Sequence, residues 1–212
     1  MKSYRALALL LRYPQPRWLA ALDEVEQVLH AERHRNRRAL SRVAPLIALL
    51  RRTPLLELEA AYVETFDRQP RHALYLYEHL FGESRARGTG MVELLERYRR
   101  AGLALDCDEL PDYLPVFLEY LSELPAREAR RELGPVAGVL RLLARRLAEA
   151  ESPYAGVLSA LDRLAQRRAP RQAPDSPRPM ERLVQRVGYT DSGREPLLTP
   201  ESMLGGGRNG RE

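Results

Sequence analysis

The chain has 212 residues, 44% of them hydrophobic and 30% charged, a balance typical of one globular domain with its own core. Its net charge of +5 is spread unevenly, because residues 165–212 hold nine arginines against six acids. Residues 1–164 therefore carry a net charge of only +2, which is too close to neutral for a nucleic-acid-binding surface. One cysteine, Cys107, excludes a disulfide framework, and no stretch approaches the roughly 20 apolar residues of a membrane span, so we expect a cytoplasmic protein without direct membrane insertion.

Apolar residues at three- and four-residue spacing, punctuated by proline and glycine, predict a series of helices. In chain order these cover residues 3–12, 17–31, 36–52, 54–66, 72–81, 84–101, 111–122, 126–150 and 152–168. Pro45 predicts a kink in the third, and residues 103–109 read as an irregular connection. No alternating pattern predicts a strand of convincing length, so the fold class is an all-α, single-domain helical bundle.

After residue 168 the composition changes to proline, arginine, serine and glycine. Such a segment buries too little apolar surface to offset the entropy lost on ordering it. The sequence therefore predicts a helical domain over residues 1–168 and a flexible, disordered tail over residues 169–212.

Three stretches in the middle of the chain form an ordered series of motifs. They read AYVETFD (Ala61–Asp67) followed by LYLYEH (Leu74–His79), then GESRARG (Gly82–Gly88), then ELPDYLPVFLEYL (Glu109–Leu121). In this order and spacing they closely resemble the NarJ-type assembly chaperones of respiratory nitrate reductase, within the TorD/DmsD family of redox-enzyme maturation proteins. The resemblance covers roughly residues 3–165 and is strongest between residues 61 and 122.

The resemblance implies a TorD-like helical chaperone and not an enzyme. Members of the family bind the N-terminal segment of their client's catalytic (alpha) subunit, hold it while the molybdenum cofactor and an iron–sulfur cluster are inserted, and are absent from the finished complex. The resemblance thus implies that no cofactor is bound stably and that the molybdenum cofactor is handled only through the client. Molybdenum-cofactor biosynthesis proteins are further candidate partners, and we expect a monomer.

The segment around Asp112 is a candidate client-binding strip. In a helix that begins there, Asp112 and Glu119 lie seven residues apart on one face, with Pro115 and Leu118 between them. The apolar side of a client helix would enter this strip, while its basic side chains reach the two carboxylates. Leu114 is a further candidate contact. The hypothesis requires a strip open to solvent; the alternative is ordinary core packing, with Asp112 as a cap.

Aromatic and charged side chains before this segment supply the other candidate contacts. Tyr62 and Tyr75 lie on aromatic-rich helical faces, and His79 follows Tyr75 by four residues, so the two are neighbours on a helix. His79 would donate a hydrogen bond or change charge near neutral pH, or else be an ordinary structural histidine. Glu64 would extend the acidic rim.

Arg85 and Arg87 begin a glycine-containing helix, a position that attracts anions. We expect one of them to pair with an acid elsewhere, and a contact with the phosphate of a pterin cofactor is the minor alternative. The spacing of the glycines fits no nucleotide-binding motif.

Two other classes of function stay open at this stage. The Arg-rich tail and a pI of 9.6 favour a helical nucleic-acid-binding protein as the runner-up, although we expect no nucleic-acid partner. The other class is a small hydrolase or cofactor-binding enzyme: His30 and His34, one helical turn apart, could bind a metal from one helix, but no catalytic or metal motif surrounds them. We therefore predict no catalytic residue and no metal site.

Overall fold

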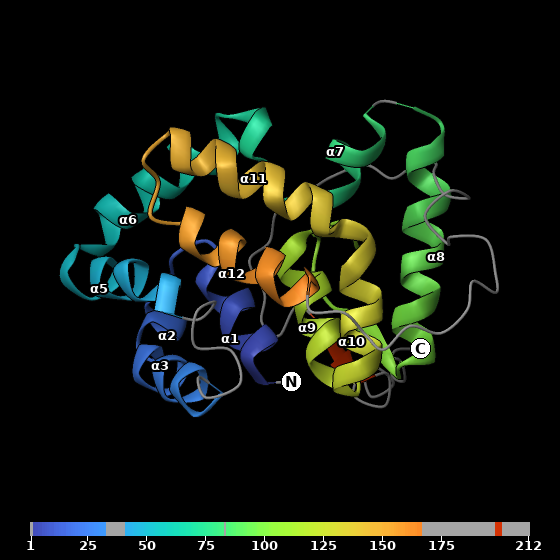
Figure 1. Ribbon diagram of the computed structural model, residues 1–212, viewed down its shortest axis with the longest axis horizontal. Helices are drawn as coiled ribbons and strands as arrows, with labels where there is room; N and C mark the ends of the chain where they lie inside the picture. Colours follow the sequence, from blue (N-terminus) through green and yellow to red (C-terminus); the bar gives the residue numbers. More distant parts are fainter. Residues whose placement is uncertain (1, 33–40, 83, 167–197, 201–212) are drawn as a thin grey trace, which may run out of the picture.

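A computed structural model describes residues 2–32, 41–82, 84–166 and 198–200, and these residues are mainly helical (Figure 1). The all-α prediction is confirmed. Within the described ranges, no helix is both long and apolar enough to cross a membrane. The predicted tail, residues 169–212, lies outside the described residues except for Leu198–Pro200.

The elements follow one another with short connections. The first part of the chain forms α1 (Lys2–Leu10), α2 (Pro16–Leu19), α3 (Leu22–Ala31), the 3₁₀ turn η1 (Ser41–Val43), α5 (Ala44–Arg52), α6 (Leu55–Tyr62), the π-helical turn η2 (Val63–Asp67) and the 3₁₀ turn η3 (Pro70–His72). The second part forms α7 (Leu76–Phe81), α8 (Ala86–Arg100), β1 (Leu103–Leu105), α9 (Leu114–Glu123), α10 (Ala126–Leu133), the 3₁₀ turn η4 (Gly134–Val136), α11 (Ala137–Glu149), α12 (Ala155–Gln166) and β2 (Leu198–Pro200).

Helix α9 is the centre of the core. Every residue from Leu114 to Leu121 is buried, and α9 packs along α1 and against α10. A helix that is apolar on all sides is stable only when other elements surround it. Its position explains why α9 carries the most hydrophobic of the three motifs.

The helices α11 and α12 form a closely packed pair, while α5 and α6 lie at one end of the molecule and α8 at the other (Figure 1). Gly156 allows α12 to approach η1, because a Cβ atom there would lie 2.1 Å from the backbone oxygen of Arg42.

The structure divides several of the predicted helices. The segment 17–31 breaks between α2 and α3, and the segment 126–150 breaks at η4, where Pro135 lacks the amide hydrogen that a continuous helix needs. Pro45 does not kink a helix: it lies in the first turn of α5, where a proline costs little. The strands β1 and β2 were not predicted; β1 falls in the segment expected to be irregular.

Candidate functional site

A small pocket opens where α6, the turns that follow it and the segment before α9 meet. Its volume is about 80 Å³. We call it the tyrosine pocket, and it is lined by Tyr13, Tyr62, Phe66, Asp67, Ala73, Leu74, Tyr75, Glu109 and Tyr113. Because ligands of drug or cofactor size need roughly 300–1,000 Å³, a pocket of this size suits a single side chain.

Tyr62 organises the floor of the pocket. Its hydroxyl donates to the backbone oxygen of Leu11 at 2.9 Å and lies 3.0 Å from the hydroxyl of Tyr113. Since the single proton of Tyr62 goes to Leu11, Tyr113 donates to Tyr62. The ring of Tyr62 also packs against Phe66, with centroids 4.8 Å apart. Burial raises the pKa of Tyr62 well above its usual range, so this hydroxyl stays a hydrogen-bond donor.

The wall of the pocket is a short extended pairing between two segments. Tyr75 and Tyr113 form an isolated antiparallel bridge, and the amide of Leu114 donates to the Leu74 oxygen at 2.8 Å. The Tyr75 hydroxyl then donates to Glu109 at 2.9 Å. These bonds fix two tyrosine rings and a carboxylate relative to one another.

The π-helical turn η2 places Phe66 and Asp67 in the pocket. The amide of Arg68 donates to the oxygen of Val63 at 3.0 Å, five residues back, which is the π-type bond. A π turn inserts one extra residue per turn and so rotates the side chains that follow; such turns are frequent at functional sites. The pocket therefore owes part of its lining to an irregular, energetically unfavoured helix end.

The mouth of the pocket is acidic and its floor is aromatic. Tyr62, Phe66 and Tyr113 are buried, whereas Tyr13 is 39% exposed and Asp67 is exposed. Glu109 is half-buried. Such a surface accepts an apolar or aromatic side chain, and the carboxylates at its mouth favour a positively charged neighbour.

Two of the predicted contacts, Tyr62 and Tyr75, thus meet in this pocket, but the predicted strip does not open. Asp112, Leu114 and Leu118 are fully buried, Pro115 is buried, and Glu119 is only 7% exposed. The prediction that these residues line an open groove is wrong, because α1 and α10 cover the faces of α9 that it assigned to a client.

The two carboxylates of the strip have internal partners. Asp112 accepts a hydrogen bond from the amide of Tyr77 at 2.9 Å, while its backbone oxygen accepts from Leu76 at 3.1 Å. It therefore caps α7 from a distant part of the chain. Glu119 lies 3.9 Å from the guanidinium of Arg12, and both side chains are buried.

The remaining predicted residues lie near the pocket or beyond it. The Nε2 atom of His79 is 2.7 Å from the Ala73 oxygen, so His79 holds the loop that lines the pocket. Glu64 is exposed and pairs with Arg68 one turn along. Arg87 lies 3.9 Å from Glu78, as expected for pairing with an acid, and Arg85 is exposed.

Tyr113 and Tyr13 are among the pocket residues that sequence reasoning missed. Tyr113 belongs to the third motif, but nothing in the spacing of that motif distinguishes it from the core residues around it. Tyr13 follows α1 without any motif, and it reaches the pocket only through the tertiary fold, where its ring packs edge-on to Tyr62 at 5.5 Å.

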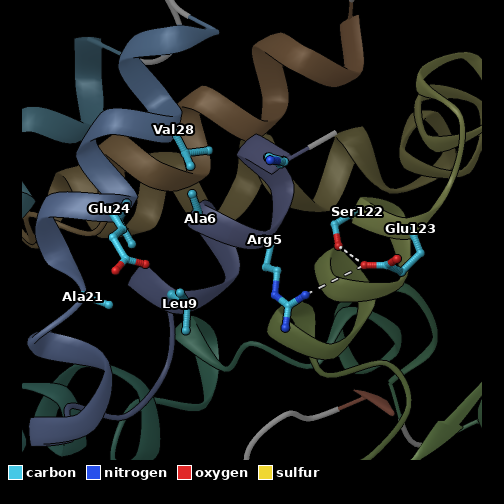
Figure 2. A pocket seen from close by; sticks show the side chains of 10 residues that line it. Arg5, Ala6, Leu9, Ala21, Glu24, Val28, Ser122 and Glu123 are labelled. Atoms are coloured by element: carbon cyan, nitrogen blue, oxygen red, sulfur yellow. Dashed lines mark hydrogen bonds and ion pairs between the residues drawn. The ribbon is translucent and has the colours of Figure 1, made fainter. Parts of the chain in front are cut away.

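A second, larger hollow lies between α1, α3 and the end of α9. Its volume is about 440 Å³, and we call it the α1–α3 groove. Figure 2 shows Ala6, Leu9 and Val28 along it, with Glu24 on one side and the Arg5–Glu123 ion pair on the other. Its lining includes Lys2, Ala21, Val25 and Ser122 but none of the predicted contacts.

The described residues contain no cluster of three or more histidine, cysteine or acidic side chains that could hold a metal ion. His34 lies outside the described residues, so the His30–His34 pair is not described as a unit. Burial raises the pKa of Cys107 to about 12, which keeps its thiol protonated and poorly reactive.

Comparison with known proteins places this sequence in a family. The family model described as nitrate reductase delta subunit matches residues 27–160. The chain is 40% identical over 166 residues to the probable nitrate reductase molybdenum cofactor assembly chaperone NarW of Escherichia coli, covering 78% of this chain and 68% of that protein. It is 38% identical over 156 residues to NarJ of the same organism, covering 74% and 66%. It is 31% identical over 160 residues to a probable NarJ of Bacillus subtilis, covering 75% and 85%. The chain belongs to the nitrate reductase delta subunit family.

Proposed function

We propose that this protein is an assembly chaperone that binds the N-terminal segment of the catalytic subunit of a respiratory nitrate reductase in the cytoplasm and keeps that subunit competent for insertion of its molybdenum cofactor and iron–sulfur cluster. The observation that carries the proposal is membership of a family whose relatives are named as molybdenum cofactor assembly chaperones of nitrate reductase. The tyrosine pocket supports it, because it offers a recognition surface for a peptide side chain.

The pocket would hold one apolar or aromatic side chain of the client segment. Burial of the client side chain against Tyr62, Phe66 and Tyr113 supplies affinity, at about 25 cal/mol per Å² of apolar surface removed from water. Asp67 and Glu109 select a basic neighbour, and exposed ion pairs of this kind add only about 0–1 kcal/mol each. Affinity is thus mainly apolar, and the charges orient the client.

In this proposal the protein acts as a monomer without catalytic chemistry and binds no cofactor of its own. The molybdenum cofactor is cargo of the client, which the chaperone keeps accessible to the biosynthetic proteins that deliver it. The tyrosine pocket itself, at about 80 Å³, accommodates a side chain but not a pterin dinucleotide.

The proposal is tested by complementation. A bacterial strain that lacks its own nitrate reductase chaperones receives this protein together with the nitrate reductase of the same source. We expect the molybdenum content of the purified reductase, measured by mass spectrometry, to rise at least tenfold over the strain without chaperone.

A matched control separates chaperoning from simple protection of the client against proteolysis. The catalytic subunit lacking its N-terminal segment should accumulate to a similar level but remain free of molybdenum whether or not this protein is present. Equal molybdenum content with and without this protein, for the intact client, would refute the proposed function.

A further inference from the structure

A short strand pairing joins the helical body to a segment far along the chain. β1 (Leu103–Leu105) pairs antiparallel with β2 (Leu198–Pro200), with Leu103 opposite Pro200, Ala104 opposite Thr199 and Leu105 opposite Leu198. Within the described ranges the sheet consists of these two strands. β2 also touches α9 and is drawn in red in Figure 1.

β1 is anchored to the body of the protein by contacts other than its strand pairing. Gly102, with φ of +73°, turns the chain out of α8 into β1, and α8 and β1 are in contact. Leu103 is buried, and Leu105 packs against the core. With its side chains anchored in this way, β1 presents a backbone edge whose amide and carbonyl groups need an extended partner.

The partner in the present structure is short and bounded by prolines. Pro200 ends β2, and Pro196 precedes it in the sequence. Proline has no amide hydrogen, so Pro200 cannot donate to the ladder. A two-stranded pairing of this length is only marginally stable by itself, and the tether strengthens it by keeping β2 at high effective concentration.

The edge lies close to the tyrosine pocket along the chain. Leu105 lies four positions before Glu109, which lines the pocket, so the two points are at most about 14 Å apart. An extended polypeptide with one side chain in the pocket can therefore reach β1 within a few residues. β1 lies inside the residues that the family model matches, and β2 lies beyond them.

We propose that the β1 edge is a docking surface for an extended polypeptide, that Leu198–Pro200 occupies it as a built-in strap in the free protein, and that the stretch of client next to the pocket-bound side chain displaces the strap. This inference rests on the proposed function for the identity of the displacing chain. The strap lowers the apparent client affinity in proportion to the fraction of time it occupies the edge. A client then has to contact both the tyrosine pocket and the β1 edge, so a polypeptide that fits only one of the two binds more weakly.

The first experiment tests the edge without any client. A fluorescent peptide with the sequence of residues 195–203 is titrated into the full-length protein and into the full-length Leu198→Pro/Thr199→Pro variant. Successive amides point to opposite sides of a strand, so one of these two must face β1 and is removed. The matched control is Tyr189→Pro/Thr190→Pro, which makes the same change outside β2.

We expect the strap peptide to bind the Leu198→Pro/Thr199→Pro variant at least tenfold more tightly than the wild type or the control, because only that variant has a vacant edge. Equal binding to all three proteins, or no binding to the variant, would overturn the proposal. Neither result depends on whether the client has been identified correctly.

The second experiment adds a synthetic peptide of the client's N-terminal segment at saturation, established by calorimetry, and follows amide hydrogen exchange. Exchange at whichever of the Leu198 and Thr199 amides faces β1 should accelerate at least tenfold while the amides of β1 stay protected by the new partner. Unchanged protection of both amides with bound client peptide would contradict the displacement. Absence of calorimetric binding would instead count against the proposed function, and the strap-peptide titration would still decide whether the edge docks a chain.

Discussion

Asp112 and Asp67 show how the same side chain takes different roles according to burial. Asp67 is exposed at the mouth of the tyrosine pocket. Asp112 is fully buried, with one carboxylate oxygen on the Tyr77 amide and the other without a hydrogen-bond partner. Burial raises the pKa of Asp112 to about 6, against the opposing effects of the Tyr77 amide and Arg87, while Glu78 adds to the rise. The residue that the sequence assigned to client binding is therefore structural.

The raised pKa of Asp112 makes a prediction about stability. Its folded-state pKa lies above the unfolded value of 3.8, so the folded protein binds the proton more tightly, and the stability from this group is lost as pH rises through the window from about 4 to 6. The free energy of unfolding lost across this window, from the pKa difference between 3.8 and about 6, amounts to about 3 kcal/mol. The Asp112→Asn variant has no charge to bury at this position. The free energy of unfolding of the variant minus that of the wild type should therefore rise by about this amount between pH 4 and pH 7.

Urea denaturation at several pH values measures this difference, with Asp67→Asn as the comparison because that carboxylate is exposed. A constant difference between wild type and Asp112→Asn from pH 4 to pH 7 would show that burial does not control this group.

At the level of the elements, the positions of α1, α5, α6 and α8 could be predicted from apolar spacing because each has one buried and one exposed face. The central, fully buried position of α9 could not be predicted in this way. Its sequence fits an amphipathic strip as well as a central helix, and only the packing of α1 and α10 around it decides between them. The π turn at Val63–Asp67 likewise depends on tertiary contacts with η3, which leave no mark in the spacing of residues.

The approach of α12 to η1 gives a prediction at this level. Gly156→Ala should lower the free energy of unfolding by about 1–3 kcal/mol, because the new Cβ atom would meet the rigid backbone oxygen of Arg42. Gly138→Ala is the matched control: it places the same methyl group in α11, where no atom lies within 4 Å, and it should stabilise the protein by up to about 1 kcal/mol through helix propensity.

Both variants are compared with the wild type by urea denaturation monitored by far-ultraviolet circular dichroism. Equal free energies of unfolding for Gly156→Ala and Gly138→Ala would contradict the close approach of α12 to the backbone of η1.

At the scale of the whole molecule, the described residues form several hollows, among them the tyrosine pocket and the larger α1–α3 groove. The first and third sequence motifs line the tyrosine pocket and are absent from the α1–α3 groove, although the groove has more than five times the volume, about 440 Å³ against about 80 Å³. The pocket is assembled from residues far apart in the chain: the motifs single out Tyr62 and Tyr75, but their meeting with Tyr13 could not be predicted from the sequence. The proposed function therefore assigns the client to the pocket because two of the motifs meet there, and not because of its size.

Isothermal titration calorimetry with a synthetic peptide of the nitrate reductase catalytic subunit's N-terminus tests this placement most directly. Tyr13→Ala removes an exposed ring of the pocket, and Glu109→Gln neutralises a carboxylate of its mouth; Glu24→Gln makes the same neutralisation at the α1–α3 groove. The account predicts that Tyr13→Ala weakens binding at least tenfold and Glu109→Gln a few-fold, whereas Glu24→Gln leaves it unchanged. Loss of affinity in Glu24→Gln, with the two pocket variants binding like the wild type, would contradict it.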